Sequence, residues 1–198
     1  IESNGDIEMF WKIFHERMTV MHDALVYRIQ RISEVTPDNA PILYKNGAFK
    51  HRLTDEEDIT TLLKGKRATL SMGYIGLYEA ATLFYGPNWE TQSIAKKFTL
   101  DILKAMKVYQ LKWTEQYDIW FSIYSTPSES LTDRFCRLDR EKYGEIPHIT
   151  DKGYYQNSFH YDVRKDITPF EKIDFEKEYS FYASGGYIHY CEYPKLNH

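Results

Sequence analysis

Apolar residues that recur every three or four positions predict two long amphipathic helices. The first begins near Ile7, where Asp6 is placed to cap it, and Pro37 sets its outer limit. The second runs from about Glu90 to Gln116. The apolar face of the first helix comprises Ile7, Trp11, Phe14, Met18, Met21, Leu25, Ile29 and Ile32, and that of the second comprises Ala95, Phe98, Ile102, Met106, Tyr109 and Trp113. The first face suits either core packing or a partner helix in a coiled coil, and core packing is its more typical use.

Shorter helices are expected where cap residues precede apolar runs. Thr54-Asp55-Glu56-Glu57 has the spacing of a capping box, and the helix that it starts should end at Gly65. Three more helices are expected: Leu77 to Tyr85, closed by Gly86-Pro87; a helix after the turn Ser125-Thr126-Pro127, carrying Leu131, Phe135 and Leu138 and ending near Gly144; and a helix started by Thr168-Pro169-Phe170-Glu171, with proline at its first position.

Runs of β-branched and aromatic residues predict strands between these helices. They cover residues 67–72, 119–124 and, after the break at Ser184-Gly185-Gly186, Tyr187 to Tyr193, while residues 148–165 are expected to be loop and strand. Strands separated by long helices indicate an α/β fold with mostly parallel strands. No internal domain boundary is evident, so residues 1–198 are interpreted as a single piece.

Composition narrows the class of protein. The 198 residues include 25 Lys and Arg against 29 Asp and Glu, a net charge of −4, which excludes a strongly basic nucleic-acid binder. Cys136 and Cys191 are the two cysteines, too few for a disulfide scaffold or a four-thiolate zinc site. No apolar run approaches the roughly 18 residues of a membrane span, and no leader is present. We therefore expect a cytoplasmic chain.

The segment from Tyr124 to Ser130 is the most informative for chemistry, because a buried strand there passes into a helix. The first amides of a helix lack intrahelical partners and favour an anion. Four hydroxyls add donors, those of Ser125, Thr126, Ser128 and Ser130. The alternative is a plain capping box, since Thr126 and Glu129 have its spacing. From residue types alone the capping box is the simpler interpretation, and Glu129 counts against a phosphate unless its carboxylate turns back to the cap.

Other candidate residues indicate structural roles. The stretch from Arg67 to Gly76 lacks both the dinucleotide and the P-loop glycine spacing. His15 and His22 share a helix face without a carboxylate arranged beside them, and His189 is typical of a structural histidine. Both cysteines are expected to be buried and inert. The charged residues from 133 to 142 form a solvated helix face. No catalytic set and no metal site is predicted.

Four segments carry a resemblance to a known family: residues 67–79 (RATLSMGYIGLYE), 121–143 (FSIYSTPSESLTDRFCRLDREKY), 149–162 (ITDKGYYQNSFHYD) and 170–194, which ends in YASGGYIHYCEYP. They resemble the anaerobic (class III) ribonucleoside-triphosphate reductases. The match runs over most of the chain from about residue 60 onward, and several stretches are too long for chance.

The resemblance implies a glycyl-radical enzyme that reduces ribonucleotides to deoxyribonucleotides. It implies that this chain is a helix-rich portion of a ten-stranded α/β barrel, and that its loop holds the phosphates of the substrate. The implied phosphate-binding residues are Ser125, Thr126, Ser128, Glu129 and Ser130. For the full-length enzyme it implies a glycyl radical, a structural zinc, ATP and dNTP effectors, a ribonucleoside triphosphate substrate, a homodimer and an activating radical-SAM iron–sulfur enzyme. It implies neither a membrane nor a nucleic acid as a partner.

The chain also departs from the family pattern. It has no glycine-radical motif, no four-cysteine zinc module and no counterpart of the finger-loop cysteine that forms the thiyl radical. We therefore expect a C-terminal part of the catalytic barrel, without catalytic residues or cofactors of its own and inactive by itself. The alternative is a separately encoded, non-catalytic relative that binds nucleotides or assembles with a partner.

Overall fold

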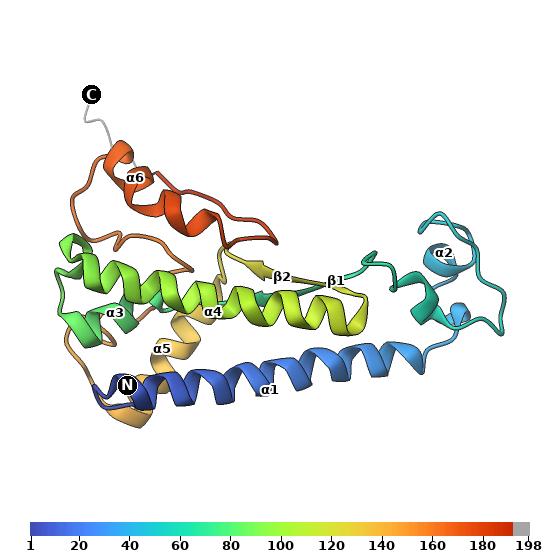
Figure 1. Cartoon of the computed structure of the whole chain (residues 1–198), viewed down its shortest axis with the longest axis horizontal. Coiled ribbons are helices and arrows are strands. Elements are labelled where there is room, and N and C mark those ends of the chain that lie inside the picture. Colours follow the sequence, from blue (N-terminus) through green and yellow to red (C-terminus); the bar gives the residue numbers. More distant parts are fainter. Residues whose placement is uncertain (192–198) are drawn as a thin grey trace. The chain divides into compact units, whose positions relative to one another are not determined.

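The structure, a computed structural model, describes residues 1–191 as helices and two short strands joined by loops (Figure 1). Its elements are α1 (Ile7–Ser33), η1 (Pro37–Asn39), α2 (Pro41–Tyr44), η2 (Ile59–Leu62), β1 (Thr69–Gly73), α3 (Leu77–Tyr85), η3 (Trp89–Thr91), α4 (Ser93–Tyr117), β2 (Trp120–Tyr124), α5 (Ser130–Tyr143) and α6 (Pro169–Ser180). Among the described residues, no helix combines the length and the apolar character needed to cross a membrane.

The chain divides into two compact units, each assembled from separate segments. The first unit contains residues 1–10 and 72–107 and the described residues from Ile123 onward, and the second contains residues 11–71 and 108–122. The boundaries fall within α1, β1, α4 and β2. The interpretation of residues 1–198 as one piece of a barrel domain stays a prediction.

Two of the predicted helices begin where their cap residues indicate, and a third has its predicted bounds. Asp6 caps α1, because its Oδ1 accepts hydrogen bonds from the amides of Glu8 (2.8 Å) and Met9 (3.0 Å). Helix α3 has the predicted bounds, and Gly86 ends it with a φ of 88° that suits glycine. Helix α6 begins with the full capping box between Thr168 and Glu171.

The helix predicted from Thr54 is wrong. The Glu57 carboxylate does accept a hydrogen bond from the Thr54 amide (2.7 Å), but no helix follows it. Asp58 acts as the cap instead, accepting from the Thr60 amide at 2.8 Å, and starts only the short η2. The second long helix likewise begins at Ser93 rather than Glu90, because residues 89–91 form the separate turn η3.

The sheet has two strands, β1 and β2. The Lys66 amide donates to the Asp118 carbonyl at 2.9 Å, and the Trp120 amide donates to the Ala68 carbonyl at 3.0 Å. The paired positions rise together along both strands, so the pair is parallel, as predicted for an α/β fold.

The last predicted strand is wrong over its described part. Tyr187 forms an isolated parallel bridge with Ser125, residues 188–191 have no strand, and residues 192–193 lie outside the described residues. The edge of β2 is instead occupied by the preceding turn. The Gly185 amide donates to the Ile123 carbonyl at 2.8 Å, and the Ile123 amide donates to Ser184 Oγ at 3.1 Å. Residues 148–165 are loop, with one antiparallel bridge between Ile75 and Asn157.

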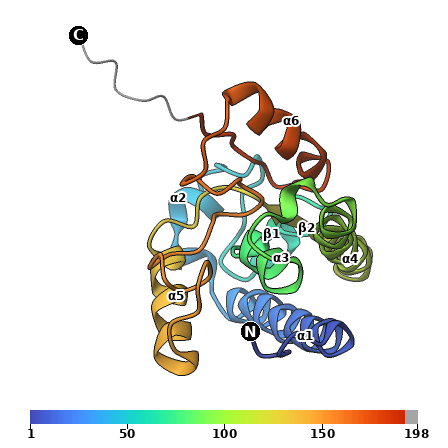
Figure 2. The same ribbon diagram turned by 90° about the vertical axis from the view of Figure 1, so that its left-hand side faces the viewer.

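The core of the first unit holds the site described below in place. Tyr78, Ala81, Trp89 and Ala95 form one buried cluster, and Cys136, Ile149 and Tyr155 form another. Helix α6 is attached to the first part of α4 (Figure 2) through a hydrogen bond of 2.8 Å between the buried hydroxyls of Tyr179 and Thr99. In the second unit, Leu53, Ile59 and Leu62 form a smaller cluster of their own.

Candidate phosphate-binding loop

The candidate site is the loop of residues 125–129, which connects the end of β2 to the start of α5. The carboxyl ends of parallel strands are the usual place for ligands in α/β folds. Ser125 is fully buried at this end, where its Oγ donates to the Tyr74 hydroxyl (3.0 Å) and its amide donates to the Gly186 carbonyl (3.0 Å). Ser125 therefore fixes the base of the loop.

A second segment braces the middle of the loop. The amide of Ser128 donates to Asn157 Oδ1 at 2.8 Å, and the hydroxyl of Ser158 donates to the Thr126 carbonyl at 3.4 Å. Ser158 is fully buried, and its φ of 45° is unusual for a residue other than glycine. The bridge between Asn157 and Ile75 attaches this segment in turn to the residues that follow β1.

The capping box between Thr126 and Glu129 does not form. Glu129 itself is the residue before the helix, with φ 47° and ψ −122°, and no side chain caps the helix. This backbone conformation is one that only glycine adopts without strain. The Thr132 amide and hydroxyl both donate to the Glu129 carbonyl, at 3.2 and 2.8 Å. The capping-box alternative is therefore contradicted.

The start of α5 consequently keeps donors for a ligand. The Leu131 amide donates to the Ser128 carbonyl at 3.0 Å. In the part of the chain that the structure describes, no group accepts a hydrogen bond from the amides of Glu129 and Ser130 or from the hydroxyls of Ser128 and Ser130. Glu129 and Ser130 are exposed and Ser128 is half-buried. These donors, at the positive end of a helix dipole, suit a phosphate group.

A cavity of about 570 Å³ adjoins the loop. Pro127 and Asn157 contribute to its wall from the loop side. Its other lining residues are Gln156, His160, Tyr161, Asp162, Val163, Arg164, Lys165, Asp166, Ile167, Lys172 and Tyr190. The cavity thus begins where the candidate phosphate loop ends, and several of its side chains are basic.

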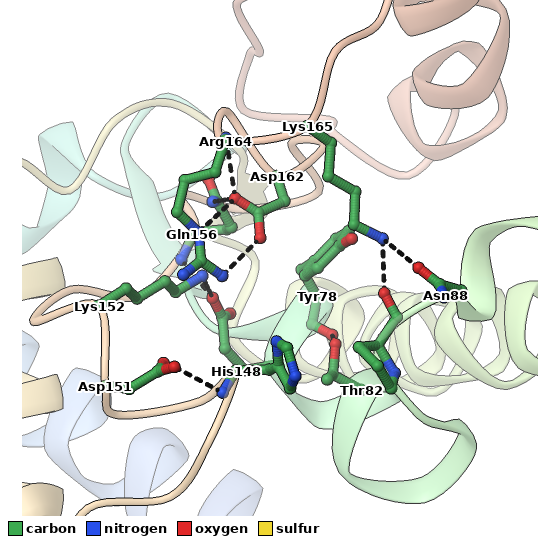
Figure 3. A network of polar contacts seen from close by, with 12 residues as sticks. Tyr78, Thr82, Asn88, His148, Asp151, Lys152, Gln156, Asp162, Arg164 and Lys165 are labelled. Carbon is green, nitrogen blue, oxygen red and sulfur yellow. Dashed lines mark hydrogen bonds and ion pairs between the residues drawn. The ribbon is translucent and has the colours of Figure 1, made fainter.

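Asp162 organises the charged side of the cavity (Figure 3). Its carboxylate accepts hydrogen bonds from the guanidinium of Arg164 at 2.9 and 3.2 Å and from the side chain of Gln156 at 3.0 Å. Burial alone raises the pKa of Asp162, but the hydrogen bonds from Arg164 outweigh it and hold that pKa below its usual value. Lys165 extends across the adjoining hollow to Asn88 (3.3 Å) and to Glu90.

A buried ion pair holds the segment that carries Asn157. The side chains of Glu79 and Lys152 are 3% and 2% exposed and form an ion pair with each other. Glu79 Oε1 also accepts a hydrogen bond of 2.9 Å from the Gln156 amide. Burial raises the pKa of Glu79, and the charge of Lys152 opposes that shift. The pair joins α3 to the segment before Asn157, so its role is structural.

The two cysteines differ in burial, and the described residues contain no group of side chains arranged to bind a metal ion. Cys136 is fully buried, with its thiol 3.7 Å from the Thr150 carbonyl, and burial raises its pKa, as expected for an inert thiol. Cys191 is half-buried, so its predicted burial is wrong. No group of three His, Cys, Asp or Glu side chains within residues 1–191 is arranged to hold a metal ion.

The sequence indicates the loop but not the residues that hold it in place. Tyr74, Asn157, Ser158 and Gly186 hold it from positions 29 to 61 residues away along the chain. A local sequence pattern does not identify hydrogen-bond partners that lie so far apart along the chain. The one signal available was their presence in the segments that carry the family resemblance, which include residues 67–79 and 149–162.

Comparison with known proteins gives one consistent result. The profile of the family described as anaerobic ribonucleoside-triphosphate reductase matches residues 1–198. The anaerobic ribonucleoside-triphosphate reductase of Escherichia coli K12 is 42% identical over 200 residues, covering 100% of this chain and 28% of the relative. The enzyme of the same name from phage T4 is 43% identical over 189 residues, covering 96% and 30%. The chain therefore spans less than a third of the length of these relatives.

Solved structures agree about the fold. The crystal structure of the anaerobic ribonucleotide reductase from Thermotoga maritima with citrate in the active site superposes with a TM-score of 0.70 at 22% sequence identity. That match covers 94% of this chain and 32% of the solved chain. A second crystal structure of the same enzyme, with glycerol in the active site, gives a TM-score of 0.69 at 18% identity and covers 28% of the solved chain. The fold is therefore that of a portion of such a reductase.

Proposed function

Because the chain belongs to the anaerobic ribonucleoside-triphosphate reductase family, we propose that it works as part of such an enzyme, which reduces ribonucleotides to deoxyribonucleotides. Its contribution is barrel structure and the loop that holds the phosphates of a ribonucleoside triphosphate. The observation that supports this role is the start of α5, where the amides of Glu129 and Ser130 and the hydroxyls of Ser128 and Ser130 have no acceptor within the described residues.

The loop residues divide into two roles under this proposal. Ser128 and Ser130 offer hydroxyls, and Glu129 and Ser130 offer amides, to the phosphate. Ser125 and Thr126 shape the loop, since the side chain of Ser125 is bound to Tyr74 and the carbonyl of Thr126 is bound to Ser158. The side chain of Glu129 is exposed and does not turn back to cap the helix, so phosphate binding requires its carboxylate to stay in solvent.

The cofactors of the whole enzyme are part of the same proposal. A glycyl radical in the whole enzyme would supply the unpaired electron that initiates the reaction, and a structural zinc, ATP and dNTP effectors, a homodimer and a radical-SAM activase belong to the same system. Cys136 does not fit a zinc site, because it is buried without other thiols or imidazoles arranged around it in the described residues. We therefore assign these groups to other parts of the enzyme. We also assign the enzyme to the cytoplasm.

The alternative of a non-catalytic relative has no observation in its favour. The relatives named above are all reductases, and the loop at the start of α5 keeps the donors that substrate binding needs. The expectation that this segment holds no catalytic residue agrees equally with its share of the relatives' length, which is 28% for the Escherichia coli enzyme.

Replacing Ser128 and Ser130 by alanine in the intact, radical-activated reductase tests the proposal. Each lost hydrogen bond weakens substrate binding by about 0.5–1.5 kcal/mol, so we expect the KM for the ribonucleoside triphosphate to rise about 5-fold or more, with a smaller change in kcat. The control S33A/S180A removes two hydroxyls at exposed helix ends and should leave KM unchanged. An unchanged KM in S128A/S130A contradicts the phosphate role of the loop.

A further inference from the structure

The cavity beside the loop contains a buried histidine with one ring nitrogen unused. The side chain of His160 is 5% exposed, and its Nδ1 lies 3.3 Å from Glu176 Oε1. Its Nε2 is buried and has no hydrogen-bond partner within the described residues. Leaving a buried polar atom unpaired costs about 1–3 kcal/mol. A position of this kind in a cavity wall indicates a ligand.

Glu176 determines which nitrogen of His160 is available. Its fully buried carboxylate accepts hydrogen bonds from His160, from His189 Nδ1 at 2.7 Å, from the Tyr161 amide at 3.0 Å and from Lys172. Burial by itself raises the pKa of Glu176, but these hydrogen bonds outweigh it and lower that pKa to about 2. Because the ionised carboxylate accepts from Nδ1 of His160, Nε2 is the ring nitrogen left to face a ligand, and it donates to that ligand when it carries a proton.

The charged side chains around His160 are matched in pairs. Arg164, Lys165 and Lys172 line the same cavity, and they form ion pairs with Asp162, Glu90 and Glu176 respectively. Asp166 also lines the cavity. The Nε2 of His160, unpaired among the described residues, is therefore the feature that indicates a ligand, rather than an excess of cations.

Tyr190 covers the ring of His160. The two rings lie 5.4 Å apart between centroids at 71°, and Tyr190 is itself 41% exposed. Tyr190 and His160 both line the cavity, so this ring contact lies at the cavity wall.

We propose that the cavity receives the terminal phosphates of a ribonucleoside triphosphate held by residues 128–130, and that His160, positioned by Glu176, donates a hydrogen bond to them from Nε2. The inference rests on the proposed function for the identity of the ligand. Pro127 and Asn157 connect the two places, since both line the cavity and both belong to the loop or to its support. His160 is then a binding residue, and Glu176 is a positioning residue.

The variants H160N and H160Q separate the two ring nitrogens. An asparagine amide falls near the position of Nδ1 and keeps the bond to Glu176, whereas a glutamine amide falls near Nε2. Titration calorimetry of the chain with CTP and with CMP gives the readout. We expect H160N to weaken CTP binding about tenfold or more and to leave CMP binding unchanged, and H160Q to keep part of the CTP affinity. H189N is the matched control, because His189 binds the same carboxylate but does not line the cavity.

A second measurement uses the wild-type chain and so does not depend on how the variants fold. In a long-range nitrogen spectrum of the imidazole rings, the Nε2 resonance of His160 should move on addition of inorganic tripolyphosphate. E176Q should change the tautomer of His160 in the same spectrum, which loss of packing alone would not do. Unchanged CTP affinity in a folded H160N, or an Nε2 resonance that does not move, overturns the inference.

The failure of this inference is distinguishable from that of the proposed function. If S128A/S130A weakens both CTP and CMP while H160N weakens neither, the loop holds phosphate and the cavity does not. If H160N weakens CTP while S128A/S130A has no effect, the cavity binds the polyanion and the loop proposal is wrong.

Discussion

Glu129 is the most strained residue of the candidate site. Its φ of 47° and ψ of −122° lie in a region that side chains avoid, and the residue is exposed. Non-glycine residues in such conformations cost about 1–3 kcal/mol and persist where the surroundings impose them. Here the bond from the Ser128 amide to Asn157 and the anchoring of Ser125 impose the conformation.

Replacing Glu129 by glycine should therefore stabilise the chain. We expect the free energy of unfolding in urea to rise by about 1 kcal/mol, because glycine adopts this conformation without strain. The control is E141G in the last turn of the same helix α5, where glycine relieves no strain and should lower stability by up to about 1 kcal/mol. A destabilised E129G would show that the conformation of Glu129 is not strained.

Glu176 links stability to pH. Its pKa in the folded chain is about 2 against an ordinary value of 4.5, so ionisation of Glu176 stabilises the folded state above pH 4.5. That contribution is lost as pH falls toward 2. The titratable groups that contact it are His160, His189 and Lys172.

The variant E176Q should accordingly be less stable by about 3 kcal/mol at pH 5, and the deficit should shrink at pH 3. Urea unfolding of both proteins at the two pH values measures the change. Other carboxylates titrate alike in the two proteins, so their contribution cancels in the difference. A deficit of the same size at pH 3 would mean that the hydrogen-bond partners of Glu176 do not lower its pKa.

At the scale of elements, two tetrapeptides show that the same local sequence pattern can lead to different structures. Thr126-Pro127-Ser128-Glu129 and Thr168-Pro169-Phe170-Glu171 have the same capping signature. The second forms a capping box, and the first does not. The difference is tertiary: the Ser128 amide is bound to Asn157, whereas the Thr168 box closes with local hydrogen bonds only.

The capping box of α6 offers a matched test. T168A removes a side chain that accepts a hydrogen bond from the Glu171 amide, so we expect a loss of about 1 kcal/mol in the free energy of unfolding. T54A is the control, because its side chain belongs to a signature with the same spacing that starts no helix, and it should change stability by less than about 0.5 kcal/mol. Equal losses in both variants would mean that the box at Thr168 adds nothing to the stability of α6.

The same contrast explains how much of the fold the sequence predicts. Helices α1 and α3 and both strands follow from periodicity and caps, because their signals are local. The Tyr187 strand failed since the glycines before it occupy the edge of β2. In the site, residues 125–130 were identified from the strand-to-helix transition and the family resemblance. Asn157 and the pair of His160 and Glu176 were missed, because three-dimensional contact brings them together.

At the scale of the whole molecule, the chain is a portion of a larger catalytic fold. It matches the reductase family over residues 1–198, yet it covers only 28% of the Escherichia coli relative. Within its first unit the end of β2, the start of α5 and the cavity lined by His160 are adjacent in structure, since Pro127 and Asn157 belong to both the loop region and the cavity wall. We thus propose that one contiguous surface of this unit, formed by the loop and the cavity wall, binds the phosphates of the substrate.

A crystal structure of the chain with a bound ribonucleoside triphosphate tests this central claim most directly, by the positions of its phosphorus atoms. The account predicts a phosphate group within about 2.7–3.2 Å, oxygen to nitrogen or oxygen, of the Ser130 amide and of the Ser128 or Ser130 hydroxyl. Phosphates bound away from the start of α5, or no nucleotide at concentrations that saturate a titration, would contradict it.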